Sequence, residues 1–306
     1  MLFVLYFIYE KVFQGAELDW RIQSFGASLD SVNEIALLSF AVVLLLANWG
    51  LEALKWQLVL RHSDALSFAE AFKGVFAGVS TSIITPNRVG EFVGKVVFLP
   101  AGKRMTGAGL SFVNSLAQLL MTFFFGALAL SFVELPSGDD EVIGYLKLFL
   151  GVIWLLTALI AILFFFLPSL LPLLKNVPLL RSPMQNIETD EMPGFQILLR
   201  ILVLSALRYG VFGLQFLLML RVFTQDLHLG LCLQYIPLMY LGLAIAPTLS
   251  LGELGVREFL ALNFIGYASS DEFGIFLSST FIWIVNIGIP AAVGAILLQS
   301  ARIVEE

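Results

Sequence analysis

Long apolar stretches separated by short polar loops dominate the chain. A membrane-spanning helix needs about 20 consecutive apolar residues. Five stretches reach that length, at residues 33–60, 107–133, 142–167, 197–222 and 273–299. The last contains Pro290, which is tolerated inside a membrane bundle because neighbouring helices satisfy the freed backbone groups. The N-terminal run, residues 1–13, is too short to decide whether it spans. The pattern predicts an all-α polytopic membrane protein of about six to eight helices.

Two further apolar regions are interrupted in the middle by proline, glycine and charge. Residues 66–100 contain TPNRVGEFVGK at 85–95, and residues 229–268 contain APTLSLGELGVRE at 246–258. Each half of these regions is too short to span alone, and a helix break within a membrane needs cover from protein or a watery cavity. We therefore expect two re-entrant or broken-helix hairpins, with break residues Pro86, Gly90, Pro247, Gly252 and Gly255.

The loops between these segments carry charges that indicate orientation, because lysine and arginine favour the cytoplasmic side. Loop bases mark the inner face at Lys103, Arg104, Lys175, Arg181 and Arg302. Loops without a base, at 134–141, 223–229 and 268–272, are expected outside. The first hairpin then enters from the inner face and the second from the outer face. Arg21, in a segment that this scheme places outside, does not fit the rule.

The two broken regions repeat one pattern of residues. Pro86 and Pro247 are 161 positions apart, and 162 positions separate Gly90 from Gly252, Glu91 from Glu253, and Lys95 from Arg257. The flanking spans match in the same order, and the charge rule puts the two halves in opposite orientations. Inverted repeats with broken helices are typical of secondary transporters. Two unrelated hairpins are the alternative.

This pattern predicts the domain organisation of the chain. Residues 1–306 are expected to form a single transmembrane domain. Its inverted repeats lie at about 33–133 and 197–299, and helix 142–167 and an elbow at 168–195 link them.

Composition excludes most other classes of protein. Of the 306 residues, 59% are hydrophobic and only 13% are charged, whereas about 25% of an average soluble domain is charged. The net charge of −6 argues against nucleic-acid binding, which uses basic patches. One cysteine, Cys232, and two histidines, His62 and His228, offer too few ligands for a metal or haem site. We expect no cofactor. The N-terminus lacks the basic and cleavable segments of a signal peptide.

The chemistry is expected where charge lies inside apolar segments, because each such charge costs about 2.5–3.5 kcal/mol on insertion scales. Glu91 with Lys95 and Glu253 with Arg257 are spaced i,i+4, so each pair would share a helix face. Half-helices that begin after the breaks would add partial positive charge, which together with the bases suits an anion such as phosphate. The expected substrate-binding residues are Arg88, Glu91, Lys95, Arg208, Glu253, Arg257 and Glu258. Alternatively, the ion pairs only neutralise each other and pin the hairpins together.

Other polar residues within the spans carry less information. Helix-to-helix hydrogen bonding is the expected role of Asn114, Gln118, Gln215, Asn263 and Asn286. Lys55 and Arg61 are expected to extend their side chains to the inner membrane interface.

The segment APTLSLGELGVREFLAL, residues 246–262, resembles the flippase-like transmembrane domain of lysylphosphatidylglycerol synthases and its stand-alone relatives. The matching positions of the two family motifs are Thr85, Pro86, Arg88, Gly90 and Glu91, then Pro247, Ser250, Gly252, Leu254, Gly255, Val256, Arg257 and Glu258. Where the family has a second glycine in the late motif, this chain has Glu253. The synthases carry a soluble aminoacyl-transfer domain after the membrane region; this chain stops at Glu306, so we expect that it does not perform that synthesis alone.

The resemblance implies translocation of lipid between leaflets. Candidate substrates are anionic or aminoacylated phospholipids and polyprenyl-phosphate lipids. We expect a flippase in the cytoplasmic (inner) membrane that is not an enzyme. Its partners would be membrane lipids, a second copy of the chain or a separate lipid-synthesising enzyme. The alternatives are a lipid-modifying enzyme that uses Glu91 or Glu253 as a base, and a non-transporting assembly subunit.

Overall fold

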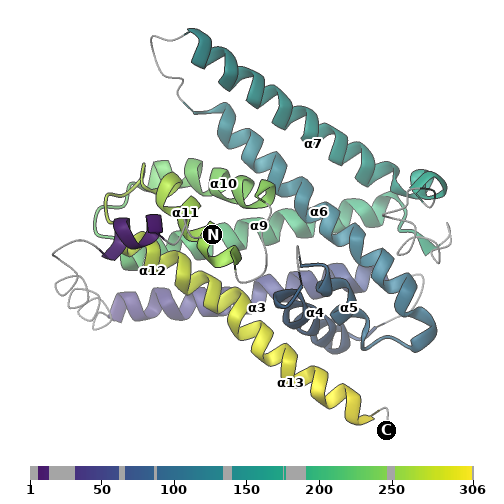
Figure 1. Cartoon of the computed structure of the whole chain (residues 1–306). Helices are drawn as coiled ribbons and strands as arrows, with labels where there is room; N and C mark the ends of the chain where they lie inside the picture. Colours follow the sequence, from purple (N-terminus) through teal and green to yellow (C-terminus); the bar gives the residue numbers. More distant parts are fainter. Residues whose placement is uncertain are drawn as a thin grey trace.

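The computed structural model describes residues 6–13, 32–61, 66–85, 88–133, 140–174, 176, 191–246 and 252–304. Every regular element among these residues is helical (Figure 1). The first half consists of η1 (Tyr9–Phe13), α3 (Val32–Val59), α4 (Phe68–Ile83), α5 (Gly90–Val96), η3 (Ala101–Lys103), α6 (Arg104–Ser131) and α7 (Asp140–Leu174). The second half consists of α9 (Phe195–Phe223), α10 (Leu229–Ile245), α11 (Gly252–Ile265), α12 (Glu272–Trp283), η5 (Ile284–Gly288) and α13 (Ile289–Val304).

Five helical segments of the described chain are long and apolar enough to cross a membrane. They are Val32–Val59, Ala101–Ser131, Glu141–Pro172, Phe195–Phe223 and Glu272–Ala301. These segments coincide with the five predicted spans to within two residues, except that the second begins at Ala101 instead of 107 and the third continues beyond 167. The prediction of an all-α polytopic membrane protein is confirmed.

Helix α7 continues beyond the point at which the elbow was expected to begin. It passes through Pro168 and Pro172 and ends at Leu174, so the predicted boundary at 167 is wrong. A proline removes one backbone donor, but packing by neighbouring segments maintains such a helix in a membrane bundle. Phe164, Leu167 and Leu171 supply that packing, since each is fully buried on the side of α7 that faces the rest of the protein.

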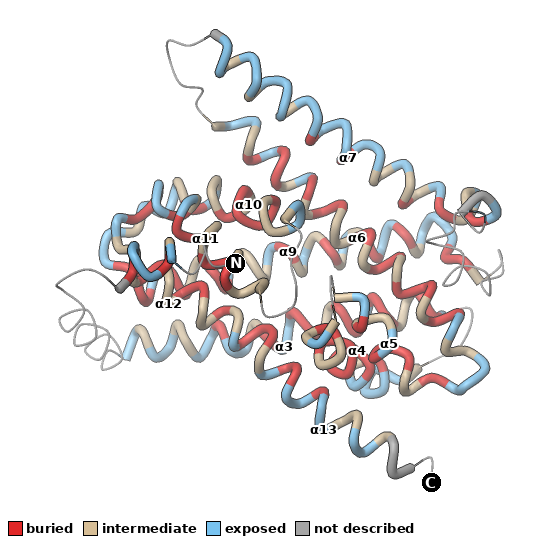
Figure 2. Tube along the Cα trace, in the orientation of Figure 1, coloured by how far each residue is buried: buried red, intermediate tan, exposed pale blue. Residues whose placement is uncertain are grey.

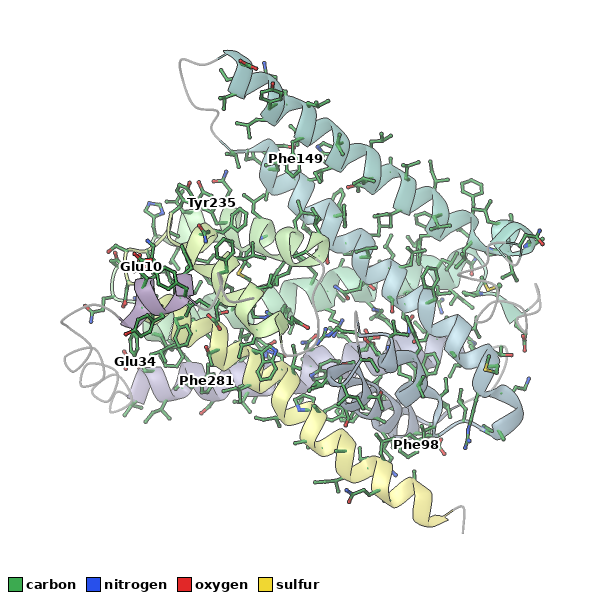
Figure 3. All side chains as sticks on the ribbon, in the orientation of Figure 1. Glu10, Glu34, Phe98, Phe149, Tyr235 and Phe281 are labelled. Carbon is green, nitrogen blue, oxygen red and sulfur yellow. The ribbon has the colours of Figure 1, made fainter. Side chains whose placement is uncertain are left out.

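The rest of α7 presents apolar side chains outward. In its most apolar stretch only 17% of the residues are buried, and Figure 2 shows most of the helix as exposed. Phe149 is one such side chain, projecting from α7 in Figure 3. An exposed apolar helix of this length indicates contact with lipid, because a large apolar surface facing water would be costly.

The π-helical turn η5 lies within the last span, directly before Pro290. The N–H of Ile289 bonds to the carbonyl of Ile284, five residues back instead of four. This wider turn lies where the proline, which lacks an N–H, would otherwise interrupt the hydrogen-bond ladder. It places Asn286 and Ile287 on a buried face of the helix.

Polar residues fix the starts of two helices. Ser67 and Glu70 form a capping box at α4: the Ser67 hydroxyl accepts from the Glu70 N–H at 3.2 Å, and the Glu70 carboxylate accepts from the Ser67 N–H at 2.9 Å. Asp271 caps α12 by accepting from the Gly274 N–H at 2.9 Å. Both helices therefore begin at residues that satisfy their free N–H groups.

Helices from the first half of the chain pack against helices from the second half. Helix α3 lies along α9, α4 packs against α13, and α10 packs against α6 (Figure 1). Small residues permit the last two contacts. A Cβ atom at Gly294 of α13 would lie 2.0 Å from the Phe76 carbonyl oxygen of α4, and one at Gly126 of α6 would lie 2.7 Å from the Leu241 Cβ of α10. Close helix approach through small residues is typical of membrane bundles.

Candidate functional site

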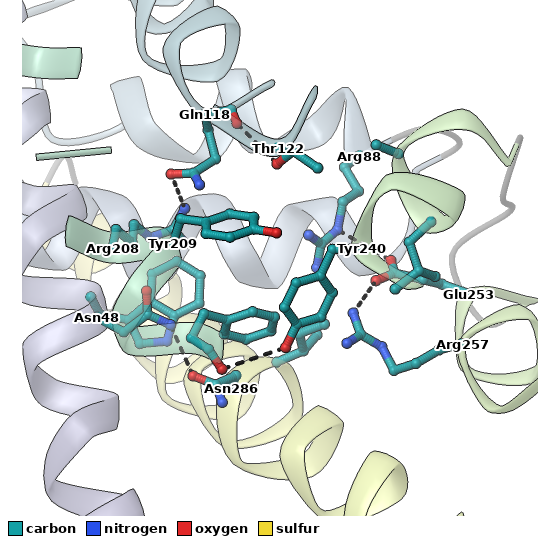
Figure 4. Close-up of a pocket in the computed structure, with 15 residues that line it drawn as sticks. Asn48, Arg88, Gln118, Thr122, Arg208, Tyr209, Tyr240, Glu253, Arg257 and Asn286 are labelled. Carbon is teal, nitrogen blue, oxygen red and sulfur yellow. Dashed lines mark hydrogen bonds and ion pairs between the residues drawn. The ribbon is translucent and has the colours of Figure 1, made fainter. Parts of the chain in front are cut away.

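A polar cavity lies where the two helical hairpins, α4–α5 and α10–α11, meet the long helices. It has two adjoining lobes, of about 270 Å³ and about 540 Å³, which share lining residues from α3, α6, α9 and α10. The shared residues include Trp49, Gln118, Thr122 and Arg208. Figure 4 shows the smaller lobe, into which polar side chains converge from elements far apart in the sequence.

Glu253 joins the two broken regions across this cavity. Its Oε2 lies 3.3 Å from Arg88 Nε, and its Oε1 lies 3.2 Å from Arg257 Nη2 (Figure 4). The Arg257 contact is the i,i+4 pair that the spacing predicted on α11. Arg88 comes instead from the residues just before α5, so described residues beside the two breaks are in contact. Glu253, the position at which the chain departs from the family motif, is the carboxylate that bridges them.

Arg88 holds an unusual backbone conformation at this contact. Its φ is +59°, in the left-handed region that residues with a side chain seldom adopt. Such strain persists only where surrounding structure fixes it, and it is concentrated at functional sites. At Arg88 this conformation precedes α5 by two residues and accompanies a guanidinium directed to Glu253.

Glu52 of α3 is the centre of a second, more deeply buried charge cluster. Its Oε2 lies 3.0 Å from Lys55 Nζ and 3.4 Å from Arg208 Nη1, and its Oε1 accepts from Lys95 Nζ at 2.8 Å. Lys95 also lies 2.6 Å from Glu91 Oε1. Both lysines are at most 1% exposed. Because Glu52 and Glu91 line the larger lobe, the cluster links the cavity wall to the interior.

Glu52 was not among the predicted site residues, and the interfacial position predicted for Lys55 is wrong. Lys55 does not reach the membrane interface, because its ammonium bonds to Glu52 and to the Asn114 carbonyl oxygen at 3.4 Å. One signal was available: Glu52 and Lys55 are spaced i,i+3 within the apolar stretch 33–60. An ionisable pair inside a span is a functional hypothesis by default, but its position near the end of the stretch favoured an interfacial interpretation.

Arg208 connects the two lobes. Its guanidinium lies 5.0 Å over the Trp49 ring and donates to Gln118 Oε1 at 3.3 Å, in addition to its contact with Glu52. On the opposite wall of the smaller lobe, Asn48 donates to Asn286 Oδ1 at 3.0 Å (Figure 4). Gln118 and Asn286 therefore make the predicted contacts between helices and also line the cavity.

Arg257 keeps unused hydrogen-bonding capacity inside the cavity. The residue is 5% exposed and its guanidinium lies 5.9 Å over the Phe212 ring. Nη2 contacts Glu253, but Nε and Nη1 have no partner among the described residues. Buried donors without partners are costly, so the free edge of this guanidinium indicates a place for an anionic ligand.

The seven predicted substrate-binding residues do not all line the cavity. Of the seven, five line the cavity: Arg88, Glu91, Arg208, Glu253 and Arg257. Lys95 lies behind this wall, bonded to Glu52 and Glu91. Glu258 faces away from the lining and accepts from Thr280 Oγ1 at 2.9 Å.

Two of the five expected break residues, Gly90 and Gly252, begin the short helices α5 and α11. Gly90 is the first residue of α5, where a Cβ atom would lie 2.3 Å from the Thr81 carbonyl oxygen, so its position requires close approach to α4. Gly252 begins α11, and Gly255 is buried within it. Pro86 and Pro247 lie outside the described residues.

The described lining itself holds three bases and three carboxylates, and two buried lysines bonded to it add further positive charge. Among the described residues, those that line it or bond directly to its lining include five bases (Arg88, Arg208, Arg257, Lys55 and Lys95) and three carboxylates (Glu52, Glu91 and Glu253). In a low-dielectric interior such an excess of positive charge attracts an anion strongly.

Comparison with known protein families gives one relevant match, which covers nearly the whole chain. The family described as lysylphosphatidylglycerol synthase TM region matches residues 4–294. Neither the curated proteins nor the solved structures give a match. The apolar helices and this match together make the protein a multi-pass membrane protein related to lipid handling. The chain belongs to the lysylphosphatidylglycerol synthase TM region family.

Proposed function

We propose that this protein is a flippase that moves lipids between membrane leaflets through the polar cavity. The single observation that carries this proposal is a cavity between two hairpins of a membrane protein, lined among the described residues by three arginines and backed by two buried lysines. The substrates are anionic or aminoacylated phospholipids, or polyprenyl-phosphate lipids. Their headgroups occupy the cavity while the acyl chains stay in lipid. The membrane is the cytoplasmic (inner) membrane.

The contacts between helices support an inverted repeat, on which this mechanism depends. In this repeat, α4 is the counterpart of α10, and α6 is the counterpart of the segment that ends in α13. The α4–α13 contact therefore has the α10–α6 contact as its counterpart. Helices α3 and α9 are counterparts of each other, and they also pack together. Gly294 approaches Phe76 at the α4–α13 contact, and Gly126 approaches Leu241 at the α10–α6 contact. The two glycines are 168 positions apart, and Phe76 and Leu241 are 165 positions apart. These separations are close to the 162 positions of the sequence repeat. On this proposal, both hairpins are re-entrant and their breaks meet near the bilayer midplane.

Transport on this proposal involves no chemical conversion of the lipid. The cavity wall offers carboxylates, guanidinium groups, amides and hydroxyls. Each carboxylate of the wall contacts at least one base. A carboxylate held in this way positions bases for an anion and is poorly suited to removing a proton. The partners of the protein are therefore the membrane lipids, with a lipid-synthesising enzyme supplying the substrate.

Reconstitution into liposomes tests this function. Fluorescent phosphatidylglycerol, distributed over both leaflets, is exposed to a membrane-impermeant quencher. The wild-type protein should render nearly all of the label accessible, whereas protein-free vesicles protect the inner half. Arg257→Ala and Glu91→Gln should each slow this movement by about tenfold or more, because each removes a charge-assisted contact worth about 1.5–3 kcal/mol.

Arg200→Gln is the matched control, because Arg200 is an exposed base of α9 outside the cavity lining. It should leave the rate of lipid movement unchanged. Equal rates for wild type, Arg257→Ala and Glu91→Gln would contradict the proposed site.

A further inference from the structure

The cavity favours one kind of headgroup among those that a flippase could carry. We propose that its ligand is a lipid ending in a phosphate monoester, bound as a dianion between Arg88, Arg208 and Arg257. This inference rests on the proposed function and narrows its substrate class.

Charge balance is the first argument. The residues of the cavity wall and those bonded directly to it contain two more bases than carboxylates. A phosphate monoester carries about −1.5 to −2 charges at pH 7, which compensates this excess. A phosphodiester headgroup carries a single negative charge and compensates half of it. An aminoacylated headgroup adds positive charge and leaves the excess uncompensated.

Unused donors are the second argument. Nε and Nη1 of Arg257 and Nε of Arg208 are buried without a partner among the described residues. A guanidinium presents its N–H groups in a planar fork that matches two phosphate oxygens at once. The terminal phosphate of a monoester exposes three oxygens, enough to satisfy donors from more than one arginine.

The third argument is that groups which would bind a cationic headgroup are already occupied. Such a headgroup would need carboxylate acceptors or aromatic faces. Both oxygens of Glu253 and both oxygens of Glu52 already contact bases of the protein. Guanidinium groups already cover the rings of Trp49 and Phe212. At these positions an ammonium group would have to displace a bound arginine or lysine, whereas an anion would add to the existing pairs.

A binding comparison tests the inference. The thermal midpoint of the purified full-length protein in neutral detergent is measured with phosphatidate, phosphatidylglycerol and lysyl-phosphatidylglycerol of matched acyl chains. Inorganic phosphate and glycerol 3-phosphate provide the same chemistry without a lipid. Phosphatidate should bind with an affinity higher than that of phosphatidylglycerol by about tenfold, because it adds charge-assisted hydrogen bonds. The two free phosphates should stabilise the protein only weakly.

Two variants of Arg257 and a control at Arg221 separate headgroup recognition from general damage. Arg257→Gln should reduce the preference for phosphatidate over phosphatidylglycerol, and Arg257→Lys, which keeps the charge but not the fork, should give an intermediate preference. Arg221→Gln, at an exposed base of α9, should keep the wild-type preference.

Several results would overturn the inference. They are equal or tighter binding of phosphatidylglycerol or lysyl-phosphatidylglycerol, equal stabilisation by inorganic phosphate alone, and an unchanged preference in a folded Arg257→Gln protein. The liposome assay keeps the two proposals distinct. Movement of several lipids without a preference for phosphatidate would leave the flippase proposal intact and refute this one. Selective phosphatidate binding without lipid movement would support this site and refute transport.

Discussion

Glu52 is a buried carboxylate that holds three bases at fixed positions within a predicted span. Lys55, Lys95 and Arg208 all contact its two oxygens, and both lysines are buried. Taking one charge out of such a cluster leaves its partners desolvated and uncompensated, which costs more than the pair contributes when intact. Glu52 therefore positions the bases, including Arg208 of the cavity wall.

The first prediction is that Glu52→Gln destabilises the protein strongly. We expect a loss of about 3–5 kcal/mol of unfolding free energy, because three bases lose their shared counter-charge. Thermal unfolding in neutral detergent measures this as a lower midpoint. Glu10→Gln is the control, since Glu10 is exposed and its change should stay within about 0.5 kcal/mol. Similar midpoints for both variants would refute the positioning role.

A second prediction concerns the backbone of Arg88. Arg88→Gly and Arg88→Ala both remove the contact with Glu253, but only glycine adopts the left-handed conformation of φ +59° without strain. The glycine variant should be more stable than the alanine variant by about 1 kcal/mol. Unfolding midpoints of the two purified variants provide the comparison. An alanine variant at least as stable as the glycine variant would show that the conformation is not strained.

Sequence could predict the individual charges of the site better than their partners. The i,i+4 pairs Glu91–Lys95 and Glu253–Arg257 follow from helical spacing alone, and both exist. The Arg88–Glu253 contact joins residues 165 positions apart and depends on how the hairpins pack, which no local pattern specifies. Glu52 was missed for the same reason, since Lys95 and Arg208 reach it from other helices.

At the scale of elements, small residues determine how closely the halves approach. A Cβ atom at Gly294 would lie 2.0 Å from the Phe76 carbonyl oxygen, whereas one at Gly210 of α9 would meet no atom within 4 Å. The first contact brings α13 against α4, the first helix of the hairpin whose second helix, α5, carries Glu91 and Lys95. The distance between α13 and α4 therefore affects the shape of the cavity.

The third prediction contrasts these two glycines. Gly294→Ala should destabilise the protein by about 1–3 kcal/mol, because α13 and α4 must separate. Gly210→Ala should be neutral or stabilising by up to about 1 kcal/mol, because alanine favours the helix. Unfolding midpoints of both variants test this. If Gly294→Ala is as stable as Gly210→Ala, close packing at that contact is not required.

A fourth prediction concerns the loop that joins α9 to α10. Asp226 accepts from Ser269 Oγ at 2.5 Å and from the Ser270 N–H at 2.9 Å, next to the start of α12. Burial, which would raise the pKa of Asp226, is outweighed by these hydrogen bonds, and the pKa falls from 3.8 to about 2. A pKa lowered by folding stabilises the folded state above the unfolded value and loses this effect as pH falls through the folded value.

Asp226→Asn should accordingly have a lower unfolding midpoint than the wild type at pH 6, where the wild-type carboxylate is ionised. The difference should narrow as the pH is lowered from about 4 toward 2. A difference that stays constant over this range would contradict the role of the ionised carboxylate.

Elements were more predictable than their ends. Apolar length alone located the five long helices, because the bilayer sets a minimum for each. Proline predicted the ends of helices less well. Helix α7 continues through Pro168 and Pro172, because buried side chains near them pack against the rest of the protein. The inner and outer orientations and the inverted repeat remain predictions from charge and spacing.

For the whole molecule, the described charged residues beside the two breaks line the inner cavity, and the apolar side chains of α7 face outward. Figure 2 shows α7 exposed along most of its length, whereas buried residues are more frequent in α6 and around the α4–α5 hairpin. Flippase activity requires that the central cavity open to both sides of the membrane in turn. This requirement is the central claim of the proposed function.

Thiol accessibility tests that claim most directly. The chain has a single cysteine, Cys232, which is fully buried. The experiment first replaces it with alanine. A Thr122→Cys substitution in this background then places one thiol in the wall of both lobes. A membrane-impermeant reagent is added to either side of oriented vesicles, and Gly102→Cys, at an open position on η3, serves as a one-sided control. We predict modification of Cys at position 122 from both sides, slowed by added phosphatidate. Modification from one side only, or from neither, would contradict transport through this cavity.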